Sequence, residues 1–300
     1  MPFSSVDSVI NAISTNGASF RSDWNKNFLP TTAALAGEWH CLARGAGNPG
    51  ADSIYNVGTN LAFQAVSDTT ANAAGIQHGG SVSTATKHIV NASAFTAAAT
   101  VAPCVLMLVD LLGFYRVTTT TIITAQTLDN TVTIPRYTDG AGVQAFIWNT
   151  NATALGAATP TFTINYTNSA GTAGRTTPTL PSLPIGKTAA SNGLILYSGT
   201  GAGKYGPFMP LASGDRGIRS IQSITQSASY VSGEYSIALC RTLLTLPITT
   251  LGVAAERDLI HQSPSFPRVI DGANLVWLMY SGAATPTNSA IAGHLDFAWN

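Results

Sequence analysis

The chain has 300 residues, which is enough for one large domain or two smaller ones. Only 9% of the residues are charged, and 14 Lys and Arg balance 14 Asp and Glu, so the formal net charge is +0. A neutral chain lacks the basic surface of nucleic-acid and anionic-membrane binding proteins, and it lacks the self-repulsion that keeps monomers apart, so association into an assembly is expected.

The three cysteines, Cys41, Cys104 and Cys240, lie far apart and form no CxxC or Cys/His pattern. We expect buried free thiols rather than a zinc site or disulfides. The N-terminal residues lack the basic and long apolar segments of a secretory signal. The longest apolar run, residues 101–115, is too short to cross a membrane, which requires about 20 residues. The sequence predicts a soluble protein made in a cytoplasm.

Residues 4–14 carry the best helix pattern, with an apolar stripe formed by Val6, Val9, Ile10 and Ile13 and a stop at Asn16-Gly17. Residues 20–30 are aromatic and polar, which indicates an extended arm or loop. We therefore interpret residues 1–36 as an N-terminal helix and arm that packs on its own domain or on a neighbouring subunit. Removal of residues 1–30 is expected to leave the remainder folded.

Residues 38–44 indicate a first strand, and residues 67–100 indicate loops with a short helix near 89–99. Residues 105–115 are apolar enough for a buried strand, with Gly113 as a bulge or turn. The segments TTTTIIT and TVTIP, which follow, favour strands because Thr, Ile and Val are branched at Cβ.

The stretch from residue 137 to residue 219 carries the clearest fold signal. Residues 143–148 form a nearly continuous apolar strand, and residues 161–167 alternate between apolar and polar side chains, as in a sheet with one buried face. A turn at 168–171 predicts a return strand over 172–177. The long Pro/Gly/Ser loop at 178–206 is interpreted as a surface for another protein.

Residues 218–226, 235–246, 274–280 and 291–299 complete the predicted strands, although the three-residue spacing of Ile218, Ile221 and Ile224 fits neither a strand nor a helix. The predicted fold is mainly β, a β-sandwich or jelly-roll-like domain over residues 37–300 with a short N-terminal helix and extended arm. A subdivision near residues 100–136 stays open.

No recognisable catalytic pattern is present. Residues 198–205 resemble a phosphate-binding loop but have Ser198 where the motif needs Gly and Tyr205 where it needs Ser or Thr. The five histidines lack metal-ligand spacing, and the carboxylates considered for a glycosidase pair are Asp215, Asp258, Asp271 and Asp296. Asp215 is expected to cap its own turn, and Arg216, Arg219, Arg241 and Arg257 are expected to pair locally or across a subunit boundary. Trp148, Trp277 and Trp299 are assigned to the core.

Several segments resemble virion structural proteins of tailed bacteriophages. They are YTDGAGVQAFIW, ATPTFTINYTNSAGTAGRTTP, FMPLASGDRGIRSI, ERDLIHQSPSFPRVIDGANL and GHLDFAW, with FLPTTAALAGEWHCLARGAGNPGAD as a looser match. The resemblance implies a head-associated capsid decoration (cement) protein with a jelly-roll-like domain, of the kind that commonly forms trimers. The major capsid protein is disfavoured because the sequence shows neither a long spine helix nor a charged extended loop.

The sequence therefore predicts a non-enzymatic virion protein, assembled in the host cytoplasm, that needs no cofactor or metal. Its expected partners are other copies of itself in a homotrimer and the major capsid protein or other virion proteins. The alternatives are a receptor- or glycan-binding module that uses exposed Tyr and Trp, and a carbohydrate-degrading enzyme. The predicted interface residues are Phe3, Val6, Ile10, Phe20, Trp24, Phe28, Lys187, Lys204 and Tyr205.

Overall fold

The computed structural model describes residues 3–28, 36–97, 101–151, 153–178, 180–181, 193–196, 206–262, 266–284 and 289–300. Within these residues the strands form three antiparallel sheets. The first sheet has the order β14 (Ala255–Asp258), β5 (Lys87–Thr96), β17 (Ser289–Trp299), β1 (Ser19–Phe28) and β3 (Gly47–Asn48), with β15 (Arg268–Val269) on β5.

The other two sheets share this arrangement of short edge strands around long central ones. The central sheet has the order β2 (Trp39–Cys41), β16 (Leu275–Ser281), β6 (Cys104–Val117), β13 (Tyr235–Ile248) and β8 (Val143–Asn149), with β4 (Phe63–Ala65) on β6. The third sheet has the order β10 (Arg175–Thr176), β9 (Thr161–Asn168), β12 (Ile218–Gln226) and β7 (Gln126–Thr127), with β11 (Leu180–Pro181) on β9. The helices are α1 (Val6–Ser14), the 3₁₀ turn η1 (Leu42–Arg44) and α2 (Leu259–Gln262). No helix in the described ranges is long and apolar enough to cross a membrane.

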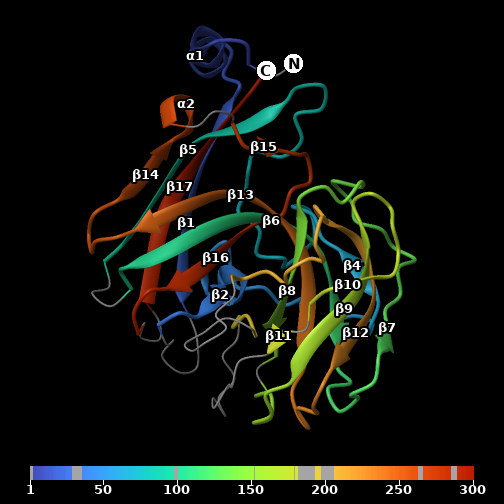
Figure 1. The fold of residues 1–300 in the computed structure, drawn as a ribbon. Coiled ribbons are helices and arrows are strands. Elements are labelled where there is room, and N and C mark those ends of the chain that lie inside the picture. Colours follow the sequence, from blue (N-terminus) through green and yellow to red (C-terminus); the bar gives the residue numbers. More distant parts are fainter. Residues whose placement is uncertain are drawn as a thin grey trace.

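The two outer sheets pack against different parts of the central sheet and enclose two hydrophobic cores. Trp24 and Leu295 of the first sheet meet Leu106 of the central sheet in one core. Ile164 of the third sheet meets Ile237 of the central sheet in the other. The molecule therefore has a first lobe, which carries α1, and a second lobe, which contains the third sheet (Figure 1).

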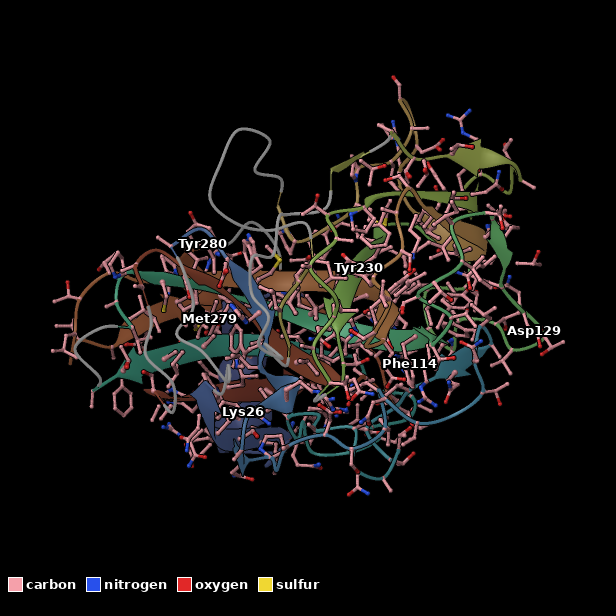
Figure 2. All side chains as sticks on the ribbon, turned by 90° about the horizontal axis from the view of Figure 1, so that it is seen from below. Lys26, Phe114, Asp129, Tyr230, Met279 and Tyr280 are labelled. Carbon is pink, nitrogen blue, oxygen red and sulfur yellow. The ribbon has the colours of Figure 1, made fainter. Side chains whose placement is uncertain are left out.

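The strands β6 and β13 belong to both lobes. They pair from Tyr235↔Val117 in the second lobe to Ile248↔Cys104 in the first. In Figure 2, Met279 of the first lobe lies on the side opposite Phe114 of the second lobe. These two strands thus link the two cores covalently and by hydrogen bonds, and β16 also contributes side chains to both cores.

The sequence-based prediction of a mainly β fold with a short N-terminal helix is confirmed. Helix α1 begins where expected, because the hydroxyl of Ser5 accepts a hydrogen bond from the N–H of Ser8 at 3.1 Å. The alternation predicted for residues 161–167 is that of β9, in which every second side chain is buried. The strands predicted over 143–148, 274–280 and 291–299 correspond to β8, β16 and β17.

The spacing of three between Ile218, Ile221 and Ile224 has a structural cause. Strand β12 carries register shifts after Ile218 and after Ile221 where it pairs with β9. Each bulge inserts one residue and returns the next isoleucine to the same face, so all three side chains are fully buried.

Three local predictions are wrong. Residues 20–28 are not an arm or loop, because Ser19–Phe28 is β1, which pairs along its whole length with β17. The helix expected near 89–99 is the strand β5, which is buried on both faces and therefore shows no period of two. The segments TTTTIIT and TVTIP form no strand and consist of turns, bends and irregular backbone. Most of the long loop at 178–206 lies outside the described residues, so its interpretation as a surface for another protein stays a prediction. Residues 193–196 within it are buried, with backbone bridges from Leu194 to His40 and from Ile195 to Trp148.

Candidate functional site

The strongest candidate for a functional surface lies at α1, at the outer end of the first lobe (Figure 1). The helix seats Val9 and Ala12 on the lobe, where Val9 packs with Val90 of β5 and Ala298 of β17. This contact fixes which side of α1 faces the protein. The other large apolar side chains of the helix remain exposed.

Three side chains of that stripe are exposed. Val6 is 48% exposed, Ile10 is 53% exposed and Ile13 is 40% exposed. They are spaced by four and three residues, so they lie on one face of the helix. The sequence pattern predicts one apolar stripe that contains these three residues and Val9. In the structure Val9 is buried and the other three are exposed. We call the exposed set the α1 face (Val6, Ile10, Ile13).

A groove with a volume of 390 Å³ lies beside the α1 face. Ile13 and Ile260 contribute to its lining at the two helices, and Phe20, Val90 and Phe297 contribute from β1, β5 and β17. Because these strands are hydrogen-bonded neighbours, residues from distant parts of the sequence border one groove. Val90 and Phe297 are buried beneath it, so Ile13, Phe20 and Ile260 provide its accessible apolar side chains. The groove continues the apolar surface of the helix.

The groove is also lined by three carboxylates, Glu256, Asp258 and Asp296. Asp258 accepts hydrogen bonds from the backbone of α2 and lies 2.5 Å from the Nδ1 of His261, which lowers the pKa of its carboxyl below the usual value. The guanidinium of Arg21 lies 3.9 Å from Asp296. An apolar surface bordered by acidic groups suits an apolar partner segment that carries basic residues.

The predicted interface residues fall into three groups. Val6 and Ile10 belong to the α1 face, Phe20 lines the groove, and Phe3 packs against the rings of His88 and Phe266. Trp24 is a core residue, 3% exposed and 5.3 Å from the ring of Trp277, so its prediction as an interface residue is corrected. The side chain of Phe28, and the whole of Lys187, Lys204 and Tyr205, lie outside the described residues.

The three cysteines are free and buried, as predicted. Burial raises the pKa of Cys41 and of Cys104 to about 12, and it raises that of Cys240 well above the usual value. Thiols held in the protonated form are poor nucleophiles at neutral pH.

The histidines with the most buried side chains are held in pairs with carboxylates. His40 lies 3.3 Å from Glu38, and His78 lies 3.1 Å from Asp68. Lys87 contacts the other ring nitrogen of His78 at 2.9 Å. In the part of the chain that the structure describes, no group of three metal-binding side chains comes together. The loop that resembles a phosphate-binding motif, 198–205, lies outside the described residues.

The four candidate carboxylates do not form one catalytic centre. Asp215 accepts hydrogen bonds from Tyr166, Asn168 and Arg175 rather than from its own turn, which corrects the prediction of a self-capped turn. Asp271 accepts hydrogen bonds from the hydroxyl of Ser81 and from the backbone N–H of Val82. Asp258 and Asp296 come together only as part of the lining of the groove. Their proximity could not be predicted from sequence spacing, because β14 and β17 lie on either side of β5 in the sheet.

The aromatic side chains give little support to a sugar-binding platform. Trp148 and Trp277 are core residues, as predicted, whereas Trp299 is partly exposed and lies 5.7 Å from the Nζ of Lys87. Among the described residues no Tyr or Trp is exposed, and Phe95, at 43%, is the exposed aromatic residue.

Comparisons with known proteins complete the description of the chain. No family model matches it, and no curated protein matches it. It is similar to the crystal structure of the infectious bursal disease virus VP2 subviral particle, with 11% identity over 94% of this chain and 80% of that chain and a TM-score of 0.19. The similarity is therefore to a protein of a viral particle, at a level too low to establish a shared fold or function.

Proposed function

We propose that this chain is a non-enzymatic virion structural protein that associates with itself, as a homotrimer, and decorates or stabilises a capsid. The observation that carries the proposal is the α1 face, whose Val6, Ile10 and Ile13 stay exposed beside a groove with apolar and acidic lining residues. Contiguous exposed apolar side chains are characteristic of protein–protein contacts. The neutral charge balance favours dense packing of copies.

The chemistry of the reactive groups supports a non-enzymatic role. Burial keeps the thiols protonated, and the carboxyl of Asp258 in the groove has a lowered pKa, the opposite of what a general acid requires at neutral pH. The resemblance of several segments to virion proteins of tailed bacteriophages supports the same role. The glycan-binding alternative is less favoured, because the described Tyr and Trp side chains are buried or partly buried.

The test is a double substitution in the α1 face, Val6→Ser with Ile10→Ser. Val6 is 48% and Ile10 is 53% exposed, so the substitutions should leave the fold intact. Burial of a large aliphatic side chain at an interface contributes about 1.5–3 kcal/mol, so self-association should weaken by at least roughly tenfold. Sedimentation velocity measures the oligomer, and co-sedimentation with particles that lack the protein measures capsid binding.

A matched control is Val57→Ser, since Val57 is 50% exposed but lies in the second lobe. It should change neither the oligomer nor capsid binding. The proposal fails if the double variant self-associates and binds particles as well as the unaltered chain does. It also fails if the unaltered chain is a monomer that does not bind particles.

A further inference from the structure

A second cavity lies where the two lobes meet, and it has a volume of 520 Å³. Tyr137, which packs on the second-lobe core, lines one part of it, and Leu243 and Phe266, which pack on the first-lobe core, line another. Strand β13 shifts register between Thr242 and Leu244 at this place. Such a bulge redirects side chains and often borders a binding site.

Two arginines line the cavity, Arg241 and Arg268. Arg241 lies over the ring of Tyr137, with 4.4 Å between its Cζ and the ring centroid. Within the described residues, neither arginine has a side-chain hydrogen bond or an ion pair. Other arginines of the chain do have carboxylate partners, at 2.6–2.8 Å, namely Arg44, Arg116, Arg136 and Arg175.

The charges around the cavity do not cancel. Asp139 is the carboxylate in its lining, and one of its oxygens already accepts the N–H of Ala141 at 3.1 Å. The nearby Asp110 is already paired with Arg136 at 2.7 Å, so these two charges cancel. The two arginines and one carboxylate of the lining then leave one positive charge in excess. Burial raises the pKa of Tyr137 to about 12, so its hydroxyl keeps its proton and stays a neutral donor.

The backbone at Tyr137 is held in an unusual conformation. Its φ is +51°, in the left-handed region that bulky residues rarely adopt. A hydrogen bond from the N–H of Gly140 to the carbonyl of Tyr137, at 2.6 Å, closes the turn. The turn places the aromatic ring against the guanidinium of Arg241, and strain of this kind is concentrated at functional sites.

We propose that this cavity binds a small organic carboxylate about the size of an acidic monosaccharide. The guanidinium of Arg241 lies over the ring of Tyr137 and has no side-chain hydrogen bond among the described residues, so its N–H groups can donate two parallel hydrogen bonds to a planar carboxylate. One excess positive charge matches a monoanion better than a dianion. Leu243, Phe266 and Ile270 provide apolar walls for an organic body, and the volume falls within the range of small-molecule sites. The site goes beyond the proposed structural role and does not depend on it.

The test is isothermal titration calorimetry of the full chain with glucuronate, glucose and inorganic phosphate. Glucuronate should bind. Glucose should bind at least roughly tenfold more weakly because it has no carboxylate to accept the charge-assisted hydrogen bonds, and phosphate should bind at least roughly tenfold more weakly because its charge does not match that of the cavity. Arg241→Gln and Arg268→Gln should each weaken glucuronate binding by roughly tenfold to a hundredfold. Arg268 is exposed, so its substitution keeps the test valid even if Arg241→Gln fails to fold.

The matched control is Arg216→Gln, an exposed arginine without a described side-chain partner that does not line the cavity. It should bind glucuronate like the unaltered chain. The inference is overturned if glucuronate does not bind, if glucose or phosphate binds as tightly, or if Arg216→Gln weakens binding as much as Arg268→Gln.

Discussion

Asp215 fastens the turn at residues 212–215 to the third sheet. Its carboxylate accepts hydrogen bonds from the hydroxyl of Tyr166 at 2.6 Å, from Asn168 at 2.7 Å and from Arg175 at 2.8 Å. The hydrogen bond from Arg175, with those from Tyr166 and Asn168, lowers the pKa of Asp215 to about 2. Protonation would remove the acceptor on which all three donors converge.

Stability in acid should therefore depend on this carboxylate. Because its pKa is lower in the folded state than the ordinary 3.8, its contribution is fully present above pH 3.8 and is lost as the pH falls toward about 2. Asp215→Asn should be less stable than the unaltered chain at neutral pH, and the difference should shrink through that window. Urea unfolding at a series of pH values measures it.

The control for the acid series is Asp23→Asn, whose side chain is 77% exposed. It should give a much smaller difference at neutral pH. A stability gap between Asp215→Asn and the unaltered chain that stays constant down to pH 2.5 would contradict the assignment.

At the scale of elements, α1 and β1 have different roles although they are adjacent in the sequence. Strand β1 pairs with β17 from Ser19↔Ala298 to Phe28↔Ser289 and contributes Trp24 to the core. Helix α1 only covers the end of the lobe, through Val9 and Ala12.

Two truncations should separate these roles. Removal of residues 1–17 should leave a folded protein of lower stability that no longer associates, because the α1 face is gone. Removal of residues 1–28 should prevent formation of the first lobe, since loss of a buried Trp alone costs about 3–5 kcal/mol and β17 also loses its partner. Limited proteolysis and circular dichroism measure both. A folded, protease-resistant product of the longer truncation would contradict this prediction and restore the sequence-based interpretation of an arm.

Elements could be predicted from the sequence where one face of a strand is buried and the other is not. Strand β9 shows this alternation along its whole length. Strand β5 does not, because Ala92 and Ser93 on its two faces are both buried, and small side chains hide the pattern further. Bulges shift the period in β12. In each case the neighbouring strands determine the pattern of buried residues, and these neighbours cannot be identified from a single sequence.

The candidate sites were predictable only in part for the same reason. Val6 and Ile10 belong to one helix, and local periodicity found them. Asp258 and Asp296 come together because both pair with Asn91 in the register of β5, and Arg241 meets Tyr137 across the junction of the lobes. These contacts depend on sheet order, which local spacing does not encode.

At the scale of the whole molecule, the shared strands β6 and β13 predict that the two lobes unfold together. Ile164→Ala in the second lobe and Leu295→Ala in the first should each cost about 2–5 kcal/mol, because both side chains are fully buried. Both variants should shift one common thermal transition, measured by calorimetry. Ile123→Ala, at a 53% exposed position, should leave it unchanged. Two separate transitions, each sensitive to only one core variant, would contradict the prediction.

The pairing of β1 with β17 has a consequence for synthesis on the ribosome. Strand β1 ends at Phe28, but its partner begins only at Ser289. Most strands of the second lobe have been made once β13 ends at Ile248, and among the described residues only β16 still has to add Val276 and Leu278 to its core. The first lobe still lacks β17, the strand that joins β5 to β1 in the sheet that covers β6 and β13. Exposed strand edges and apolar side chains favour aggregation. Nascent chains that end between residues 248 and 289 should therefore depend most on chaperones.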